Sequence, residues 1–322
     1  MCNRKYLLFA LLLVLLLMLS GCGNAGEKAV MTVGENAVSY DEYRYFYMNF
    51  RKDYEAMGEE GNLAGMKSAI EEALRLKYAK VELAKEAGVT LSDSELAELK
   101  NTRASYVEYY GGEEGFAEAL NDSSLTESLF MKQLEFQALE QKLREYAYEE
   151  FSGMIQSDDA TVEAYIQSDF CHATQILIRS EAGDDLVVNY QLAQELHDRA
   201  VAGEDFDALI REYNEDPGMN GDTVGYYFTH GQLLKKFEDA AYALEIGGIS
   251  DVIMTENGYH IIKRLSLDDD YINEHFEELR ILYKVRMFNV MADEKAQELE
   301  VRYLKRFDAL TDESLLTAAS EK

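Results

Sequence analysis

The feature that most constrains this chain is its scarcity of proline, because Pro217 is the only one in 322 residues. Proline breaks helices, since it lacks a backbone donor and its ring clashes with the preceding turn. Long helices are therefore permitted almost anywhere along the chain. The hydrophobic fraction of 47% supports a sizeable core and argues against a disordered chain. At roughly 100–200 residues per domain, this length predicts about two domains.

The chain is strongly acidic, with 61 Asp and Glu residues against 31 Lys and Arg residues and a formal net charge of −30. Such a chain lacks the basic surface that neutralises phosphates, so we expect no nucleic-acid partner. The histidines show no metal-ligand spacing, and no glycine-rich phosphate loop is present. We therefore predict a protein without a metal or another cofactor.

The N-terminus has the pattern of a targeting signal. Arg4 and Lys5 form a short positive region, and the run from Tyr6 to Leu19 is almost wholly apolar. This run is shorter than the about 20 residues of a membrane span and fits the apolar region of a signal peptide. The sequence Leu-Ser-Gly-Cys that ends at Cys22 resembles the lipobox of bacterial lipoproteins. The alternative is an uncleaved anchor with an incidental cysteine.

The lipobox resemblance implies a signal peptide over residues 1–21 and a lipid on Cys22. Residues 22–36 then form a lipidated N-terminus and tether, which runs into a short strand at Val30 to Val33. Acyl chains hold a protein on the membrane surface. We therefore expect a lipid-anchored protein on the extracytoplasmic face of the cell membrane.

Helical spacing of apolar residues dominates the chain from Ser39 to about Asp169. Ser39 fits a helix N-cap, because carboxylates occupy the turn that follows it. The spacing predicts long helices over Met66–Ala87 and Leu125–Phe151, and Ser92–Glu95 opens another one. This part of the chain is therefore expected to be almost entirely helical.

Helical spacing returns after residue 266. We predict an uninterrupted helix from Tyr271 to Leu310, with Leu299, Tyr303 and Phe307 among its inward residues. A helix of this length can serve either a homodimer interface or the core of the chain itself.

Residues 171–265 have a different pattern, which predicts strands and helices in the order β-α-α-loop-α-β-β. Ala173–Ile178 reads as a buried strand, and a loop rich in Gly, Asp and Asn spans Asn214–Gly225. The Asn257-Gly258 pair, between two apolar runs, is a strong hairpin signal. The pattern predicts a small α+β domain.

Three stretches of this segment resemble the parvulin-type peptidyl-prolyl isomerases: ATQILI at 173–178, GEDFDALIREYNED at 203–216, and GQLLKKFEDAAYALEIGGISDVIMTENGYHIIK at 231–263. The flanking helices, with a lipobox ahead of them, resemble the PrsA/SurA foldases. This resemblance implies an α+β chain with an isomerase domain over 170–265. That domain is inserted in a mostly α-helical chaperone domain formed by 37–169 and 266–322.

The resemblance also implies the apolar half of a site. Leu233 and Phe237 match the residues that hold the substrate proline, and Val224 matches a third wall position. X-Pro isomerisation crosses a twisted amide that is less polar than the planar one. An apolar pocket therefore favours the twisted state relative to water, without a metal or a covalent intermediate.

The polar half of the implied site consists of His260, Asp216 and Thr255, together with Gln175. Gln175 stands where the family usually has a first histidine. Glutamine donates and accepts hydrogen bonds, but it does not titrate near neutral pH as histidine does. His172 lies three residues earlier and is no substitute, because strand alternation places it on the opposite face.

The resemblance implies a foldase that isomerises X-Pro bonds in exported proteins and binds unfolded clients. We expect no preference for phosphorylated substrates, because residues 179–185 carry one base against three acids. One alternative is a chaperone that holds unfolded chains with a weak or inactive isomerase domain. Another is a solute-binding lipoprotein, which predicts repeated β-α-β alternation that residues 39–169 lack.

Overall fold

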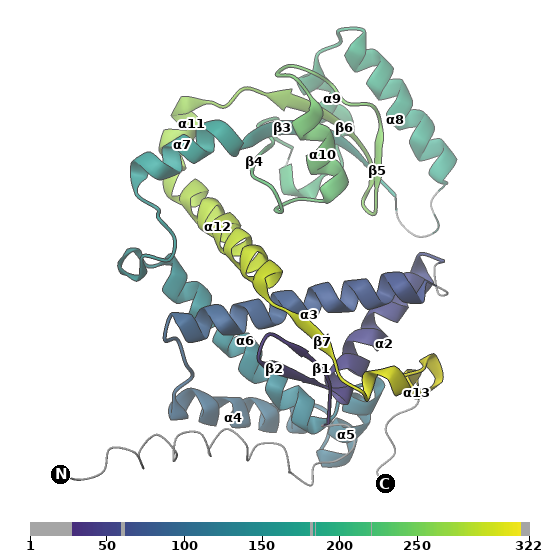
Figure 1. Ribbon diagram of the computed structural model, residues 1–322. Coiled ribbons are helices and arrows are strands. Elements are labelled where there is room, and N and C mark those ends of the chain that lie inside the picture. The colour runs from purple at the N-terminus through teal and green to yellow at the C-terminus, as the bar shows by residue number, and fades with distance from the viewer. Residues whose placement is uncertain (1–27, 59–61, 181–182, 184, 220, 317–322) are drawn as a thin grey trace, which may run out of the picture. The chain divides into compact units, whose positions relative to one another are not determined.

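The computed structural model describes residues 28–58, 62–180, 183, 185–219 and 221–316 (Figure 1). The chain divides into unit 1, Met1–Tyr146 with Met291–Lys322, and unit 2, Ala147–Val290. The predicted signal peptide and the lipidation site at Cys22 lie outside the described residues. Within the described ranges, every helix is too short or too polar to cross a membrane.

Unit 1 is built mainly from helices that precede the isomerase-like segment (Figure 1). Two of them, α3 and α6, have 24 and 22 residues, as expected for segments without proline. Ser39 caps α2 by accepting from the backbone of Glu42, and Ser92 forms a reciprocal capping box with Glu95 at the start of α4. The helices are α2 (Tyr40–Ala56), α3 (Leu63–Glu86), α4 (Asp93–Tyr109), α5 (Glu113–Asp122) and α6 (Glu127–Tyr148).

A three-stranded antiparallel sheet completes unit 1, in the order β2-β1-β7. The strands β1 (Ala29–Val33) and β2 (Asn36–Ser39) form a hairpin, which confirms the short strand predicted at Val30 to Val33. The third strand, β7 (Val301–Tyr303), comes from the far end of the chain and pairs with β1. The two ends of the described chain are therefore joined by backbone hydrogen bonds.

The uninterrupted helix predicted from Tyr271 to Leu310 is wrong. The segment contains α11 (Asp269–Glu274) and α12 (Phe276–Glu298), and it then leaves the helical path to form β7. No glycine or proline marks this end. Tertiary pairing with β1 decides it, because the apolar residues of the last segment pack on the core around β1 from a strand and a short turn.

Unit 2 contains the α+β domain, whose four-stranded antiparallel sheet has the order β4-β3-β6-β5. One face of the sheet packs against α8 and α9, and the other packs against α10. The strands are β3 (Cys171–Arg179), β4 (Tyr226–Phe228), β5 (Ile253–Thr255) and β6 (Gly258–Leu265). The helices are α8 (Leu186–Val201), α9 (Phe206–Tyr213) and α10 (Lys235–Ala243).

The predicted order β-α-α-loop-α-β-β holds with one addition. The structure adds the strand β4, which the sequence pattern does not contain. This strand has only three residues and directly follows a polar loop, so it is too short to show the alternation of apolar and polar residues that marks a strand. A short helix before the domain, α7 (Asp159–Asp169), also belongs to unit 2, where Arg280 of α12 pairs with Asp159.

The turn between β5 and β6 depends on Gly258, which has φ +132°. A Cβ built there would lie 2.2 Å from the carbonyl oxygen of Ile178 in the neighbouring strand. We expect Gly258→Ala to lower the free energy of unfolding of unit 2 by about 2–3 kcal/mol, because backbone strain and a clash act together.

The matched control is Gly247→Ala, where φ is +84° and no atom lies within 4 Å of the added carbon. It should cost only about 1 kcal/mol, from backbone strain alone. Urea unfolding followed by circular dichroism measures both variants. Equal losses would show that the close approach of the β3 backbone is unimportant.

Candidate functional site

A small pocket opens on the face of the sheet that packs against α10. Its volume is about 140 Å³. Apolar and polar side chains share the lining, so the pocket has an apolar wall and a polar wall. The lining residues are Gln175, Leu177, Asp216, Tyr226, Leu233, Leu234, Phe237, Asn257 and His260.

Leu233 and Phe237 form the apolar wall, as their spacing predicts. Phe237 is 3% exposed, and its ring meets the ring of His260 edge-on, with centroids 5.9 Å apart. Val224 is not among the lining residues: it is 45% exposed, and its carbonyl oxygen lies 2.8 Å from Nε2 of His172, away from the pocket. Tyr226 takes part in the lining from the adjacent strand.

The position of Leu233 is fixed by a buried carboxylate on α10. Glu238 accepts hydrogen bonds from the backbone N–H groups of Gly231, Gln232 and Leu233, at 2.8–2.9 Å. Gln232 in turn accepts from the backbone of Thr229 at 3.0 Å. These bonds satisfy the amides that precede the helix and hold the turn against its first residues.

The polar wall is a continuous chain of hydrogen bonds across the two central strands. Thr255 and His260 Nε2 are 2.6 Å apart, and His260 Nδ1 lies 2.6 Å from Gln175 Oε1. Gln175 Nε2 donates to Asp216 Oδ2 at 2.5 Å, and the Tyr226 hydroxyl donates to the same oxygen at 2.8 Å. The structure thus brings together all four polar residues that the resemblance implies.

The network assigns the proton positions. Asp216 and the carbonyl oxygen of Gln175 only accept, so Gln175 donates to Asp216 and His260 donates from Nδ1. The Thr255 hydroxyl then donates to the unprotonated Nε2 of His260. Every partner is satisfied with a neutral imidazole, a neutral amide and one carboxylate.

Burial keeps His260 neutral. The side chain is 2% exposed, and its burial lowers the pKa of His260 to about 4, against the weaker opposing effects of Asp216 and Glu256. Burial and the hydrogen bond to Asp216 raise the pKa of Tyr226, so its hydroxyl remains a donor at all ordinary pH values. The site therefore holds the same protonation pattern across the neutral range.

Tyr226 is the member of the network that sequence reasoning missed. It belongs to β4, the strand that the pattern did not reveal, and its hydroxyl reaches Asp216 from beside the pocket. The only signal in the sequence was its place between Gly225 and two aromatic residues. Gly225 has φ +79°, and a Cβ there would meet the carbonyl oxygen of Ala173 at 2.3 Å, so the backbone needs glycine to approach β3 so closely.

His172 lies away from the pocket, as strand alternation predicts. Its ring stacks on Tyr227 with centroids 3.9 Å apart. Nδ1 is 2.7 Å from the carbonyl oxygen of Ser266, and Nε2 is 2.8 Å from that of Val224. Both contacts are hydrogen bonds only when the ring carries two protons, because a carbonyl oxygen cannot donate.

The arrangement suits chemistry that needs no metal and no nucleophile. Within the described residues, no group of His, Cys, Asp and Glu is placed to hold a metal ion. Cys171 is fully buried, and burial raises the pKa of its thiol, which disfavours the reactive thiolate. What remains is an apolar wall facing a neutral hydrogen-bonding wall with one fixed carboxylate.

The low pKa of His260 predicts how stability changes with pH. The unfolded chain binds this proton near the ordinary pKa of 6.5, whereas the folded chain binds it only near 4. The stabilising contribution is therefore complete above about pH 6.5 and is lost as the pH falls toward 4. Urea unfolding at about pH 7.5 and about pH 5 should show a larger loss for the wild type than for His260→Gln. Equal losses in the two proteins would contradict the assignment.

Comparisons with known proteins match the segment that contains this pocket. The family model described as "Rotamase: PPIC-type PPIASE domain" matches residues 176–266. The Foldase protein PrsA of Geobacillus kaustophilus is 27% identical over 305 residues, which cover 92% of this chain and 86% of the relative. The Foldase protein PrsA of a second Geobacillus strain is 40% identical over 102 residues, covering 31% of this chain and 37% of the relative.

Among solved structures, PrsA from Bacillus anthracis matches with a TM-score of 0.34 and 23% identity, covering 70% of this chain and 94% of that one. PrsA from Bacillus subtilis matches with a TM-score of 0.28 and 21% identity, covering 85% and 91%. The sequence matches place the catalytic domain in the segment that carries the pocket. Residues 176–266 therefore match a PPIC-type peptidyl-prolyl isomerase domain of the parvulin type, and the chain is similar to a PrsA foldase over 92% of its length.

Proposed function

We propose that this chain catalyses cis-trans isomerisation of X-Pro bonds in unfolded exported proteins, at the pocket between α10 and the sheet. The observation that carries the proposal is the chain of hydrogen bonds from Thr255 to Tyr226, which faces the apolar wall of Leu233 and Phe237. The matching relative is named a foldase, which fits an action on proteins that are still folding.

The substrate proline enters against Leu233 and Phe237, where its ring replaces water. The uncatalysed barrier of an X-Pro bond is about 18–20 kcal/mol and arises from amide resonance. Rotation removes that resonance and lowers the polarity of the bond, so an apolar wall binds the twisted state better than the planar one. The reaction becomes tenfold faster for every ~1.4 kcal/mol by which the wall binds the twisted state more tightly than the planar state.

The polar wall orients the substrate by shape and hydrogen bonding, and its groups need not change charge. Gln175 keeps its carboxamide aligned because one end donates to Asp216 and the other accepts from His260. A histidine in its place would titrate near neutral pH. We therefore infer that the glutamine makes the isomerase rate nearly independent of pH between about 5.5 and 8.5.

Substrates without phosphate fit this site. Asp216 contributes its carboxylate to the lining, and Glu215 beside it accepts from the backbone of Arg179 at 2.7 Å. The predicted loop over residues 179–185 carries one base against three acids. A phosphorylated residue next to the proline would be repelled by these charges.

We further propose that the chain acts at the extracytoplasmic face of the membrane, with a lipid on Cys22 as its anchor and unfolded chains as clients. The support is the lipobox-like sequence that ends at Cys22 and the extended similarity to a foldase. Mass spectrometry of the protein from the membrane fraction tests directly whether Cys22 carries a lipid. The variant Cys22→Ser lacks the lipidated thiol and should be released from the membrane.

The second candidate is a chaperone with an inactive isomerase domain. Gln175 favours it, because a residue that cannot titrate occupies the position of the family's first histidine. The two candidates predict the same client binding and differ only in the rate of proline isomerisation.

Isomerisation of a short X-Pro peptide by the purified chain separates these candidates. We expect a rate well above background for the wild type and a fall of about tenfold to a hundredfold in kcat/KM for His260→Ala and Leu233→Ala, equivalent to about 1.4–2.8 kcal/mol. Leu186→Ala is the matched control, since Leu186 lies on α8 and is 47% exposed. A wild type that suppresses client aggregation but leaves the peptide at its background rate would establish the second candidate.

Tyr226→Phe tests the positioning of Asp216. The variant keeps the apolar ring in the lining and loses one hydrogen bond to the carboxylate. The loss of about 1 kcal/mol should lower kcat about fivefold with KM little changed. Tyr213→Phe, whose hydroxyl contacts Arg199 on α8, is the control. A change confined to KM would show that the hydroxyl contacts the substrate instead.

A further inference from the structure

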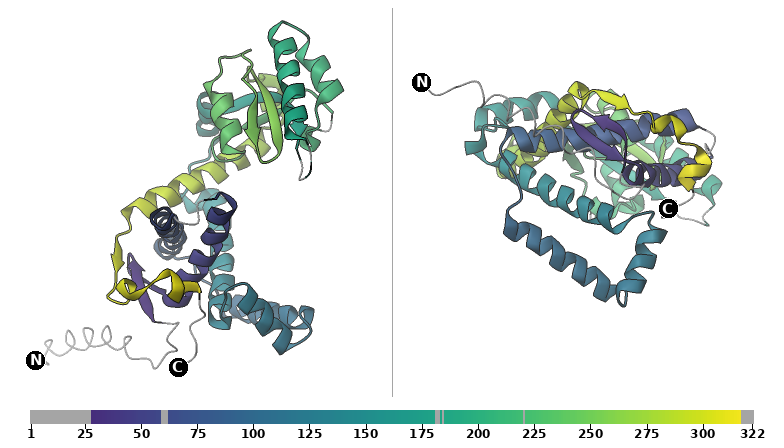
Figure 2. Two further views of the ribbon diagram at one scale, coloured as in Figure 1. Left: turned by 90° about the vertical axis from the view of Figure 1, so that its right-hand side faces the viewer. Right: turned by 60° about the horizontal axis from the view of Figure 1, so that its bottom comes forward.

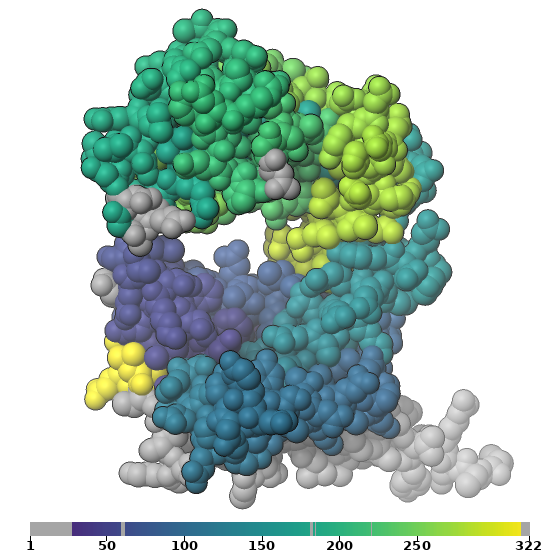
Figure 3. Space-filling view, turned by 180° about the vertical axis from the view of Figure 1, so that it is seen from behind, coloured from purple at the N-terminus to yellow at the C-terminus, as the bar shows by residue number. Residues whose placement is uncertain are grey.

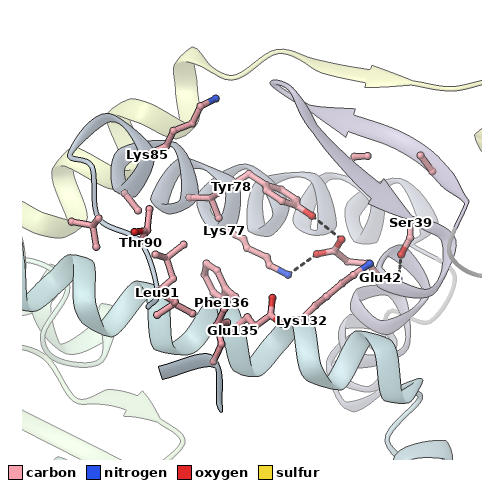
Figure 4. Close-up of a pocket in the computed structure, with 17 residues that line it drawn as sticks. Ser39, Glu42, Lys77, Tyr78, Lys85, Thr90, Leu91, Lys132, Glu135 and Phe136 are labelled. Carbon is pink, nitrogen blue, oxygen red and sulfur yellow. Dashed lines mark hydrogen bonds and ion pairs between the residues drawn. The ribbon is translucent and has the colours of Figure 1, made fainter. Parts of the chain in front are cut away.

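Unit 1 contains a cavity several times larger than the isomerase pocket, with a volume of about 680 Å³ (Figure 4). This size falls in the about 300–1,000 Å³ range of ligand-binding pockets. Its walls come from β1, β2, α2, α3, α4, α6 and the loop that joins α3 to α4. No part of the isomerase mechanism uses it.

The cavity is lined mainly by apolar side chains. Val81 of α3 and Phe136 and Leu139 of α6 are half-buried, with part of their surface turned to the opening. Leu91 in the loop and Leu96 on α4 complete this lining. Apolar surface that stays partly exposed in the free protein is available to a ligand that buries it.

One wall carries an ion pair that is almost fully buried. Lys77 Nζ lies 2.6 Å from Glu42 Oε1, and the two side chains are 10% and 6% exposed. The Tyr78 hydroxyl donates to the second oxygen of Glu42 at 2.7 Å, and burial raises the pKa of Tyr78 (Figure 4). Burying charges costs free energy that apolar residues would avoid, so this pair is not explained by stability alone.

The ion pair offers both kinds of hydrogen-bonding group. An ammonium has three donors, and Lys77 uses one on Glu42 and a longer one, at 3.4 Å, on Gln133. A carboxylate has lone pairs beyond the two that Lys77 and Tyr78 occupy. Peptide groups present a carbonyl and an N–H together, which matches this pair better than a purely apolar ligand does.

The lining is nearly neutral, unlike the protein as a whole. It includes Lys77, Lys85 and Lys132 against Glu42 and Glu135, whereas the chain carries a net charge of −30. Neutral and apolar segments therefore meet no long-range repulsion in this cavity. Strongly basic segments have more favourable places to bind elsewhere on the acidic surface.

Two features of the rim suit an extended and variable occupant. Ala37 and Ser39 of β2 line the cavity, and β2 is an edge strand of the sheet, so its outer side has no strand partner within the described part of the chain. On the other side, α4 has no buried residue. Leu96 therefore adds apolar surface to the cavity from a helix that lies outside the core around β1.

The two helices α4 and α5 project from the rest of unit 1 in both views of Figure 2. Their outer surface is seen in blue in Figure 3. This placement leaves α4 with solvent over much of its surface, consistent with the absence of buried residues along it. The wall that α4 contributes to the cavity is thus a separate helix and not part of the core around β1.

We propose that this cavity binds an apolar, uncharged segment of an unfolded polypeptide in extended form. The segment places one or two apolar side chains between Val81, Leu91 and Phe136, and its peptide groups meet Lys77 and Glu42. This inference rests on the proposed foldase function and names the place and chemistry of client binding.

Two substitutions obstruct the cavity from opposite sides without touching the ion pair. Ala37→Trp and Thr90→Trp both start from exposed residues of the lining, so the added rings enter the opening and leave the core intact. Ala104→Trp is the matched control, because Ala104 is exposed on α4 and outside the lining.

The probe is reduced, carboxymethylated α-lactalbumin with a fluorescent label, whose binding to the full chain is followed by anisotropy. We expect each obstructing variant to bind this unfolded protein about tenfold more weakly than the wild type. Ala104→Trp should bind as the wild type does, and all variants should keep the wild-type melting temperature and isomerase rate on a short peptide.

Wild-type affinity in both obstructing variants would overturn the proposal, and so would variants that lose only the binding of a small apolar dye, 1-anilinonaphthalene-8-sulfonate. Failure of the foldase function itself would look different, because the wild type would then neither bind the unfolded protein nor isomerise the peptide. A second variant pair, Lys77→Met with Glu42→Gln, should weaken binding of the unfolded protein while leaving dye binding unchanged.

Discussion

The pairing of β3 with β6 is the interaction on which the candidate isomerase site depends. These antiparallel strands run side by side from His172 to Arg179 and place Leu177 opposite His260. That register sets Gln175 and His260 on one face, although 85 residues separate them in the chain. A slip of one strand by one residue would place these two side chains on opposite faces of the sheet and break the network. The Gly258 turn, where the backbone passes close to Ile178 and Arg179 of β3, lies at one end of this pairing.

The two units bury polar groups in opposite ways, and each way fits one of the two proposed tasks. In unit 2 the site stays neutral apart from Asp216, because burial holds His260 unprotonated and Gln175 has no charge to lose. The proposed rotation of an amide needs a fixed and weakly polar surrounding, which this arrangement supplies. In unit 1 a charged pair lies beside an apolar cavity, where groups that donate and accept can meet the backbone of a bound chain.

Much of this could be predicted from sequence because the signals were local or were carried by long matching stretches. The helix starts at Ser39 and Ser92 follow from side-chain capping, and the hairpin at Asn257-Gly258 follows from turn chemistry. The site residues on β3, β6 and α10 came from the resemblance. Tyr226 and the end of α12 were missed for one reason: both depend on short strands whose pairing partner is distant in the chain. The assignment of Val224 to the pocket wall remains a prediction, and Val224 is not among the residues that line the pocket.

The scarcity of proline and the helical spacing of apolar residues determined that most of the chain is helical. The motifs between residues 171 and 265 indicated the isomerase domain and the candidate side chains of its site, because they depend on short spacings along the chain. Only the tertiary structure decided that β7 closes the first sheet, that Gln175 takes a fixed orientation between His260 and Asp216, and that Glu42 and Lys77 meet beside a large cavity. Each of these joins residues that are remote in sequence, so geometry in space, rather than local pattern, sets their chemistry.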